Sequence, residues 1–135
     1  MTDAERKYEA LFENVRDAVL VADTERTITN CNAAFIDLFG YSREEVLGKK
    51  TRALYDNAEE FEELGRAIAA HADTPRFAQT VHYRTKTGRV FPGETSVFYH
   101  RNDAGTPVAF VGTIRDVSEQ RGAEQRARHL PEALR

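Results

Sequence analysis

The chain has 135 residues, of which 41% are hydrophobic, so it suits one ordinary globular domain and not a disordered segment. Its net charge of -3 argues against a nucleic-acid-binding surface, and no apolar run approaches the roughly 20 residues needed to cross a bilayer. The charged N-terminus lacks an apolar signal core and the single cysteine, Cys31, excludes an internal disulfide, so we expect a cytoplasmic domain without membrane insertion.

The first predicted element is a short amphipathic helix over residues 5–12, in which Tyr8, Leu11 and Phe12 share one face. It belongs to an N-terminal flanking segment of residues 1–16. Residues 18–22 are continuously apolar, and a strand of this kind is expected to be covered on both faces. A turn over residues 23–26 leads to a second strand over residues 27–31.

Two short helices are predicted after the second strand. Asn32 can cap the first, because its side-chain oxygen can accept a hydrogen bond from a free backbone N–H. Gly40 can take the left-handed conformation that ends this helix. Ser42 and Glu45 form a capping-box pattern for the second helix, which Gly48 stops after barely two turns.

The longest internal helix is predicted from residue 58 to about residue 70. A second capping-box pattern, Asn57 to Glu60, begins it. Gly65 leaves room on this helix for another group to approach closely. Its apolar stripe consists of Phe61, Leu64, Ile68 and Ala72.

From residue 76 the hydrophobic period changes to two, which is typical of strands. Strands over residues 77–84 and 89–100 are joined by a hairpin signal at 86–88, and a last strand covers residues 107–114. A polar helix follows from residue 119 to about His129. This order predicts an α+β fold, an antiparallel sheet with its helices packed on one face.

Seven short motifs stand in a characteristic order and spacing. They are Leu11-Phe-Glu-Asn14, Asp17-Ala18, Asn32-Ala-Ala-Phe35, Phe39-Gly-Tyr-Ser42, Glu45-Val-Leu-Gly48, Lys86-Thr-Gly88 and Gly112-Thr-Ile-Arg-Asp-Val-Ser118. Together they resemble the PAS family of sensor domains over residues 8–120. The resemblance implies a five-stranded antiparallel sheet in the order 2-1-5-4-3, a sensor domain over residues 17–118, and an exit helix in residues 119–135.

The resemblance also implies a ligand-binding space between the long helix and the sheet. The residues expected to face this space are Phe61, Leu64, Ile68, Val81, Tyr83, Thr95, Phe110 and Ile114. This mostly apolar set, with two polar side chains, suits a pocket for a small organic ligand and equally suits a filled core. The sequence leaves both interpretations open.

No cofactor is predicted, and flavin is disfavoured on two grounds. Flavin-binding members place a reactive cysteine on a helix, whereas Cys31 falls in a strand. They also present amide side chains at positions where this chain has Tyr83, Gly93 and Ile114, so the polar edge of the flavin ring would lack partners.

Haem is disfavoured because haem-binding members supply a histidine from the long helix. The nearest positions here are Glu63 and Leu64, and His71 lies two turns further on. No histidine spacing indicates a metal site. No carboxylate pair or Ser–His arrangement is expected in the pocket, so the domain is predicted not to be an enzyme.

Asp116 and Ser118 are the candidates for signal relay. Asp116 resembles the acid of the family's output motif and can pair with Arg84, Lys86 or Arg89 on the hairpin. It can also act as a simple helix cap. The two roles are compatible.

Residues 97–99 and 110–111 put apolar side chains on both faces of the sheet, so its convex face needs a cover. The N-terminal helix can supply part of it through Tyr8, Leu11 and Phe12, and a second copy of the domain the rest. We therefore expect a homodimer that adjoins the signalling domains of a parent chain, most often a histidine kinase. The alternative is a ligand-free structural dimerisation or spacer domain.

Overall fold

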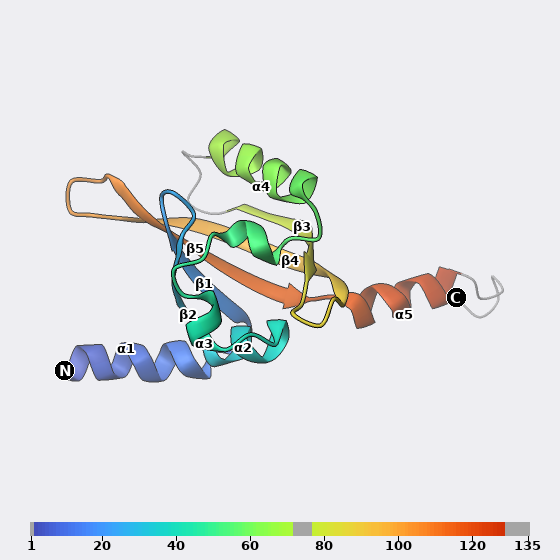
Figure 1. Cartoon of the computed structure of the whole chain (residues 1–135), viewed down its shortest axis with the longest axis horizontal. Helices are drawn as coiled ribbons and strands as arrows, with labels where there is room; N and C mark the ends of the chain where they lie inside the picture. The colour runs from blue at the N-terminus through green and yellow to red at the C-terminus, as the bar shows by residue number, and fades with distance from the viewer. Residues whose placement is uncertain (1, 72–76, 129–135) are drawn as a thin grey trace.

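The computed structural model describes residues 2–71 and 77–128 (Figure 1). In chain order its elements are α1 (Asp3–Asn14), β1 (Ala18–Asp23), β2 (Ile28–Cys31), α2 (Ala33–Phe39), α3 (Arg43–Val46), the 3₁₀ helix η1 (Thr51–Leu54), α4 (Ala58–Ala70), β3 (Phe77–Arg84), β4 (Val90–Arg101), β5 (Pro107–Asp116) and α5 (Ser118–Arg128).

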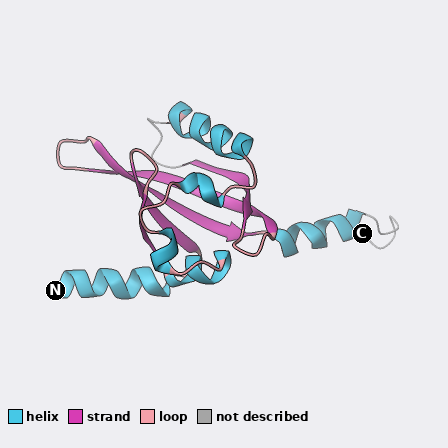
Figure 2. Cartoon of the chain, in the orientation of Figure 1, coloured by secondary structure: helices cyan, strands magenta, loops and turns pink. Residues whose placement is uncertain are grey.

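The five strands form one antiparallel sheet in the order β2-β1-β5-β4-β3, which confirms the predicted α+β fold and strand order. Figure 2 shows the internal helices gathered over one side of the sheet, while α1 and α5 extend away at opposite ends. The predicted exit helix begins one residue earlier than expected. Its continuation to His129 lies outside the described residues.

Asn32 joins three elements through its side chain. Its oxygen accepts from the backbone N–H groups of Val19 at 2.8 Å and Phe35 at 3.0 Å, so it caps α2 as predicted and also holds β1. Its amide group donates to the carbonyls of Phe12 at 3.1 Å and Asp17 at 3.0 Å. This fully buried amide therefore connects the end of α1 to the start of the domain.

The capping box at α3 is confirmed, with Ser42 and Glu45 bonding each other's backbone. The second predicted box, at α4, is only half formed. Asn57 accepts from the backbone of Glu60 at 2.9 Å, but the Glu60 carboxylate instead accepts from the backbone N–H of His82 at 3.1 Å. Its other oxygen lies 3.0 Å from the His82 ring nitrogen. The first turn of α4 is thereby held to β3, and a tertiary contact has replaced the local one.

The concave side of the sheet has two halves. Under α2, aromatic rings are packed together: the centroids of Phe35 and Phe39 lie 4.6 Å apart, and those of Phe39 and Phe91 lie 5.5 Å apart. The other half lies under α4 and η1. The sequence did not predict η1. The predicted stripe of α4 buries Leu64 and Ile68, and its last member, Ala72, falls outside the described residues.

Candidate functional site

A small cavity lies between α4, η1 and the sheet. Its volume is about 40 Å³. The residues that line it are Leu20, Ala22, Arg26, Thr51, Tyr55, Leu64, Ile68, Tyr83, Thr95, Val97, Phe110, Gly112 and Ile114. The wall is mostly aliphatic and aromatic, and its polar groups are few, which is the usual composition of a ligand site.

Six of the eight pocket residues expected from the sequence lie on this wall: Leu64, Ile68, Tyr83, Thr95, Phe110 and Ile114. Val81 is instead fully buried in the core. The Phe61 ring packs edge-on to Tyr55, with centroids 5.5 Å apart, and carries the Arg26 guanidinium 4.0 Å above its centre. That a ligand occupies the cavity stays a prediction.

Sequence reasoning missed the part of the wall that comes from β1 and from η1. Leu20 and Ala22 alternate along a strand whose continuous apolar run hid which side chains face inward. Gly112 pairs with both Leu20 and Val97 and places the three on one line across the sheet. The strand register could have identified these residues, whereas no sequence pattern indicated that Thr51 lines the cavity.

Arg26 reaches the cavity from the turn between β1 and β2. It donates from Nη2 to the Tyr55 hydroxyl at 2.6 Å and from Nη1 to the Phe61 carbonyl at 3.3 Å. Its backbone has a φ of 66°, the only positive value at a non-glycine residue in the described ranges. A Cβ on Gly65 would stand 3.2 Å from Arg26 Nη1, so the glycine predicted to admit a close approach admits this guanidinium.

Two tyrosine hydroxyls face the same region and remain neutral at ordinary pH. Burial raises the pKa of Tyr83 well above its usual value, and its hydroxyl lies 2.7 Å from that of Thr95, which in turn donates to the Gly93 carbonyl at 3.1 Å. Burial also raises the pKa of Tyr55, while Arg26 and the nearby Thr51 hydroxyl oppose the rise.

The start of α5 is fixed to the sheet by Asp116. One of its carboxylate oxygens accepts from Arg89 Nη2 at 2.8 Å, and the other accepts from the Ser118 backbone at 2.9 Å and from the Ser118 hydroxyl. Asp116 therefore combines the ion pair and the cap that the sequence left open. The other candidate bases are engaged elsewhere, Arg84 with Asp56 and Lys86 with Glu45.

Burial acts to raise the pKa of Asp116, but the bonds from Ser118 and Arg89 outweigh it, and the pKa lies below its usual value. Two further bonds hold α5, from the Val117 backbone to the Pro92 carbonyl at 3.0 Å and from Arg121 Nη2 to the Thr80 hydroxyl at 2.8 Å. We call this set of contacts the α5 anchor.

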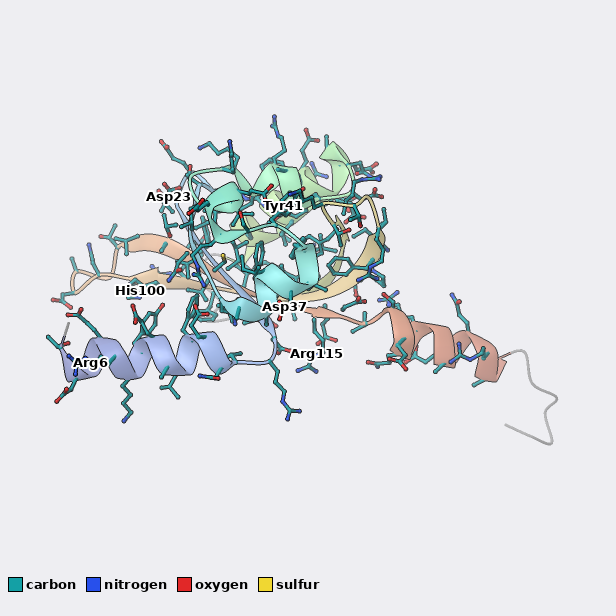
Figure 3. All side chains as sticks on the ribbon, turned by 60° about the horizontal axis from the view of Figure 1, so that its bottom comes forward. Arg6, Asp23, Asp37, Tyr41, His100 and Arg115 are labelled. Atoms are coloured by element: carbon teal, nitrogen blue, oxygen red, sulfur yellow. The ribbon has the colours of Figure 1, made fainter. Side chains whose placement is uncertain are left out.

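The cavity and the α5 anchor share two strands. Ile114 and Thr95 line the cavity and pair with each other, and the next pair on the same face is Asp116 with Gly93. Arg115, labelled in Figure 3 near the start of α5, bonds Asp17 through two contacts of 3.2 Å. The end of β5 is thus the point where cavity wall, exit helix and N-terminal segment meet.

A family model for the PAS domain matches residues 16–119. The chain belongs to the PAS domain family. Sporulation kinase C of Bacillus subtilis (strain 168) is 28% identical over 144 residues, and the sensor histidine kinase TmoS of Ectopseudomonas mendocina is 23% identical over 135 residues. Both alignments cover 99% of this chain, but the chain spans only 33% and 14% of those proteins.

The PAS fold is also shown by solved structures. The crystal structure of the PAS domain of a protein from Colwellia psychrerythraea superposes with a TM-score of 0.80 at 20% identity, covering 87% of this chain and 99% of that one. Among the described residues, no helix is both long and apolar enough to span a membrane.

Cys31 and the helix-end His71 of this PAS domain both occupy structural positions. Cys31 is fully buried in β2, and burial raises the pKa of its thiol. His71 caps the end of α4, where its Nδ1 lies 2.8 Å from the Ala67 carbonyl and its ring stacks on Phe77 at 4.8 Å. Within the described residues, no three acidic, histidine or cysteine side chains are placed to hold a metal ion.

Proposed function

We propose that this PAS domain is the sensory module of a larger cytoplasmic signal-transduction protein, in first place a sensor histidine kinase. In this proposal, occupancy of the cavity changes how firmly the α5 anchor holds the exit helix. The relatives support the class of parent protein. The observation that carries the mechanism is the register of β4 and β5: the cavity pair Thr95–Ile114 is followed on the same sheet face by the pair Gly93–Asp116.

A small change in free energy is enough to loosen the α5 anchor. The side chains of Arg89 and Asp116 are 50% and 26% exposed, and an ion pair of this kind is worth only about 0–1 kcal/mol. A ligand that slightly shifts the end of β5 therefore needs little differential binding energy to change the population of the anchored helix.

A fusion of the chain to a histidine kinase catalytic core tests the proposal. Asp116→Ala removes both the ion pair and the cap, and we expect autophosphorylation to change by about threefold or more, because the lost contacts are worth about 1 kcal/mol. Asp103→Ala, an exposed carboxylate in the β4–β5 turn, is the control and leaves the rate unchanged. If Asp116→Ala changes only the melting temperature, the residue is a cap and the relay is refuted.

The proposal includes no flavin or haem. The Tyr83 ring closes the space beside Gly93, where an added Cβ would lie only 2.7 Å from that ring, and the open volume is far smaller than either cofactor needs. The purified protein is therefore expected to show no absorption band between about 350 and 600 nm. A yellow or red preparation would contradict this part of the proposal.

The proposal also includes a homodimer formed through α1 and the convex sheet face. α1 packs against α2 and buries Phe12, but Tyr8 and Leu11 remain 54% and 63% exposed and Val15 extends the exposed apolar surface. Native mass spectrometry is expected to show a dimer that Leu11→Gln weakens and Lys7→Gln does not. A monomer at all concentrations would refute the homodimer. A dimer that never binds a small molecule would favour the alternative function, a ligand-free structural spacer domain.

A further inference from the structure

One end of the cavity is polar. Arg26 and Tyr55 are joined by their side chains at 2.6 Å, and Thr51 joins them through its backbone, which donates to the Arg26 carbonyl at 2.9 Å. All three residues line the cavity. The opposite walls carry aliphatic side chains, including Leu20, so the space has a polar end and an apolar body.

The Thr51 hydroxyl is the first sign that this end is built for a ligand. Thr51 is only 3% exposed, and its oxygen has no hydrogen-bond partner in the part of the chain that the structure describes. The hydroxyl lies near enough to Tyr55 to oppose the rise in the pKa of that phenol, but the Tyr55 hydroxyl bonds Arg26 and the Thr51 oxygen stays unpaired. Because a buried unpaired hydroxyl is unfavourable, a group that enters the cavity and bonds it is favoured.

Arg26 is the second sign. It is partly buried at the cavity wall, and no carboxylate pairs with it among the described residues. A guanidinium carries five N–H donors, and the hydrogen bonds of Arg26 to Tyr55 and Phe61 leave donors available.

Two residues that place this guanidinium are locally unfavourable for stability. Arg26 occupies a left-handed backbone position that favours glycine or asparagine. Gly65 occupies the interior of α4, where alanine would be more stable, and thereby leaves room for Arg26. Both choices are explained if a positive charge is needed at the cavity wall.

We infer that the cavity binds a short-chain monocarboxylate of about two or three carbons, with its carboxylate on Arg26, Tyr55 and Thr51 and its alkyl chain among the aliphatic side chains. The open volume of about 40 Å³ exceeds the roughly 10–15 Å³ that one water needs and lies well below the roughly 150 Å³ of a cavity that holds benzene, so a ligand of a few atoms fits. This inference rests on the proposed function, because it takes the cavity to be the sensory site.

Titration of the whole chain with sodium propionate, followed by amide NMR at constant ionic strength, tests the inference. We expect saturable shifts in β1, α4 and β5, and propionamide, which has the same shape without the charge, should bind about tenfold more weakly or worse. Arg26→Gln should lower the propionate affinity by a similar factor and Thr51→Val by about threefold. Arg66→Gln, which removes an exposed charge from α4, should leave the propionate affinity unchanged.

Thr51→Val keeps the inference testable if Arg26→Gln fails to fold, because it removes only an unpartnered hydroxyl. The inference is overturned if no short carboxylate binds, if propionamide binds as well as propionate, or if both variants bind like the wild type. Propionate binding that leaves the Asp116 and Ser118 resonances unmoved would instead uphold the inference and refute the proposed function.

Discussion

The two halves of the concave face differ in how completely they are filled. Under α2, the rings of Phe35 and Phe39 pack with that of Phe91 on β4 and form a solid aromatic cluster. Under α4, the shorter side chains of Leu64 and Ile68 leave the cavity. Both halves use the same strand alternation, so the difference lies in the covering helices. One half is closely packed, and the other leaves the cavity that we propose as the ligand site.

Tyr83 stands at the boundary between these halves. Its ring stacks on Phe91 at 5.6 Å and meets the edge of Phe39 at the same distance, while its hydroxyl bonds Thr95 on the cavity side. A movement of this ring would therefore be resisted by the aromatic cluster, so in the proposed mechanism an occupant acts through β4 and β5 instead.

The largest expected effect is in the solid half. Phe39→Ala removes a ring that is fully buried among three other rings, and we expect it to lower the free energy of unfolding by about 3–5 kcal/mol. Urea unfolding followed by circular dichroism measures this. A loss below about 1 kcal/mol would show that the cluster is not the stable part of the domain.

A smaller loss is expected on the cavity side. Leu64 is 3% exposed but borders open space, so Leu64→Ala forfeits fewer packing contacts and should cost about 2–3 kcal/mol, at the low end of such substitutions. The same urea experiment compares the two variants directly. A cost as large as that of Phe39→Ala would erase the distinction between the halves, and an unchanged unfolding curve would refute the burial of Leu64.

Thr51→Val should change stability in the opposite direction. The substitution replaces an unpartnered buried hydroxyl with a methyl group and is expected to raise the free energy of unfolding by about 1 kcal/mol in the absence of ligand. Thr95→Val is the matched control, because the Thr95 hydroxyl makes two hydrogen bonds and its loss should destabilise by about 1–2 kcal/mol. Equal losses from both variants would show that the Thr51 hydroxyl has a partner.

The smallest effect concerns the rim of the solid half, where Lys86 of the hairpin meets Glu45 of α3 at 2.7 Å. The hydrogen bonds from Lys86 and Ser42 lower the pKa of Glu45 to about 2. The contact therefore contributes fully above the ordinary pKa of 4.5 and is lost as the pH falls through about 2. Carboxyl-carbon NMR should show this titration, and Lys86→Ala should move the midpoint back toward 4.5; a midpoint near 4.5 in the wild type would exclude the contact.

The sequence predicted the solid half better than the cavity. Periodicity located β3, β4 and β5, and cap residues such as Asn32 and Ser42 located the short helices, because these signals are local. The strand order came from the resemblance to the PAS family. Six of the expected pocket residues lie on the wall because alternation along strands and helix faces is readable from sequence.

The polar end of the cavity was not readable, because tertiary hydrogen bonds create it. The segment before η1 is held by the β1–β2 hairpin, with bonds from Gly48 to Ile28 and from Thr51 to the carbonyl of Arg26. These contacts join residues that are far apart in the sequence, and no periodic pattern indicates them. Glu60 shows the same limit, since a local capping box was predicted and a bond to His82 formed instead.

Amide hydrogen exchange along α5, compared between the empty and the filled cavity, tests the central claim most directly. The cavity can be filled with propionate or by Gly112→Ala, whose added Cβ meets its nearest described neighbour, the Ser96 carbonyl, at 3.9 Å without a clash. We expect filling to change the exchange rates of α5 by about twofold or more while those of α1 stay constant. Unchanged α5 rates under both treatments, with the cavity demonstrably filled, would contradict the coupling of cavity to exit helix.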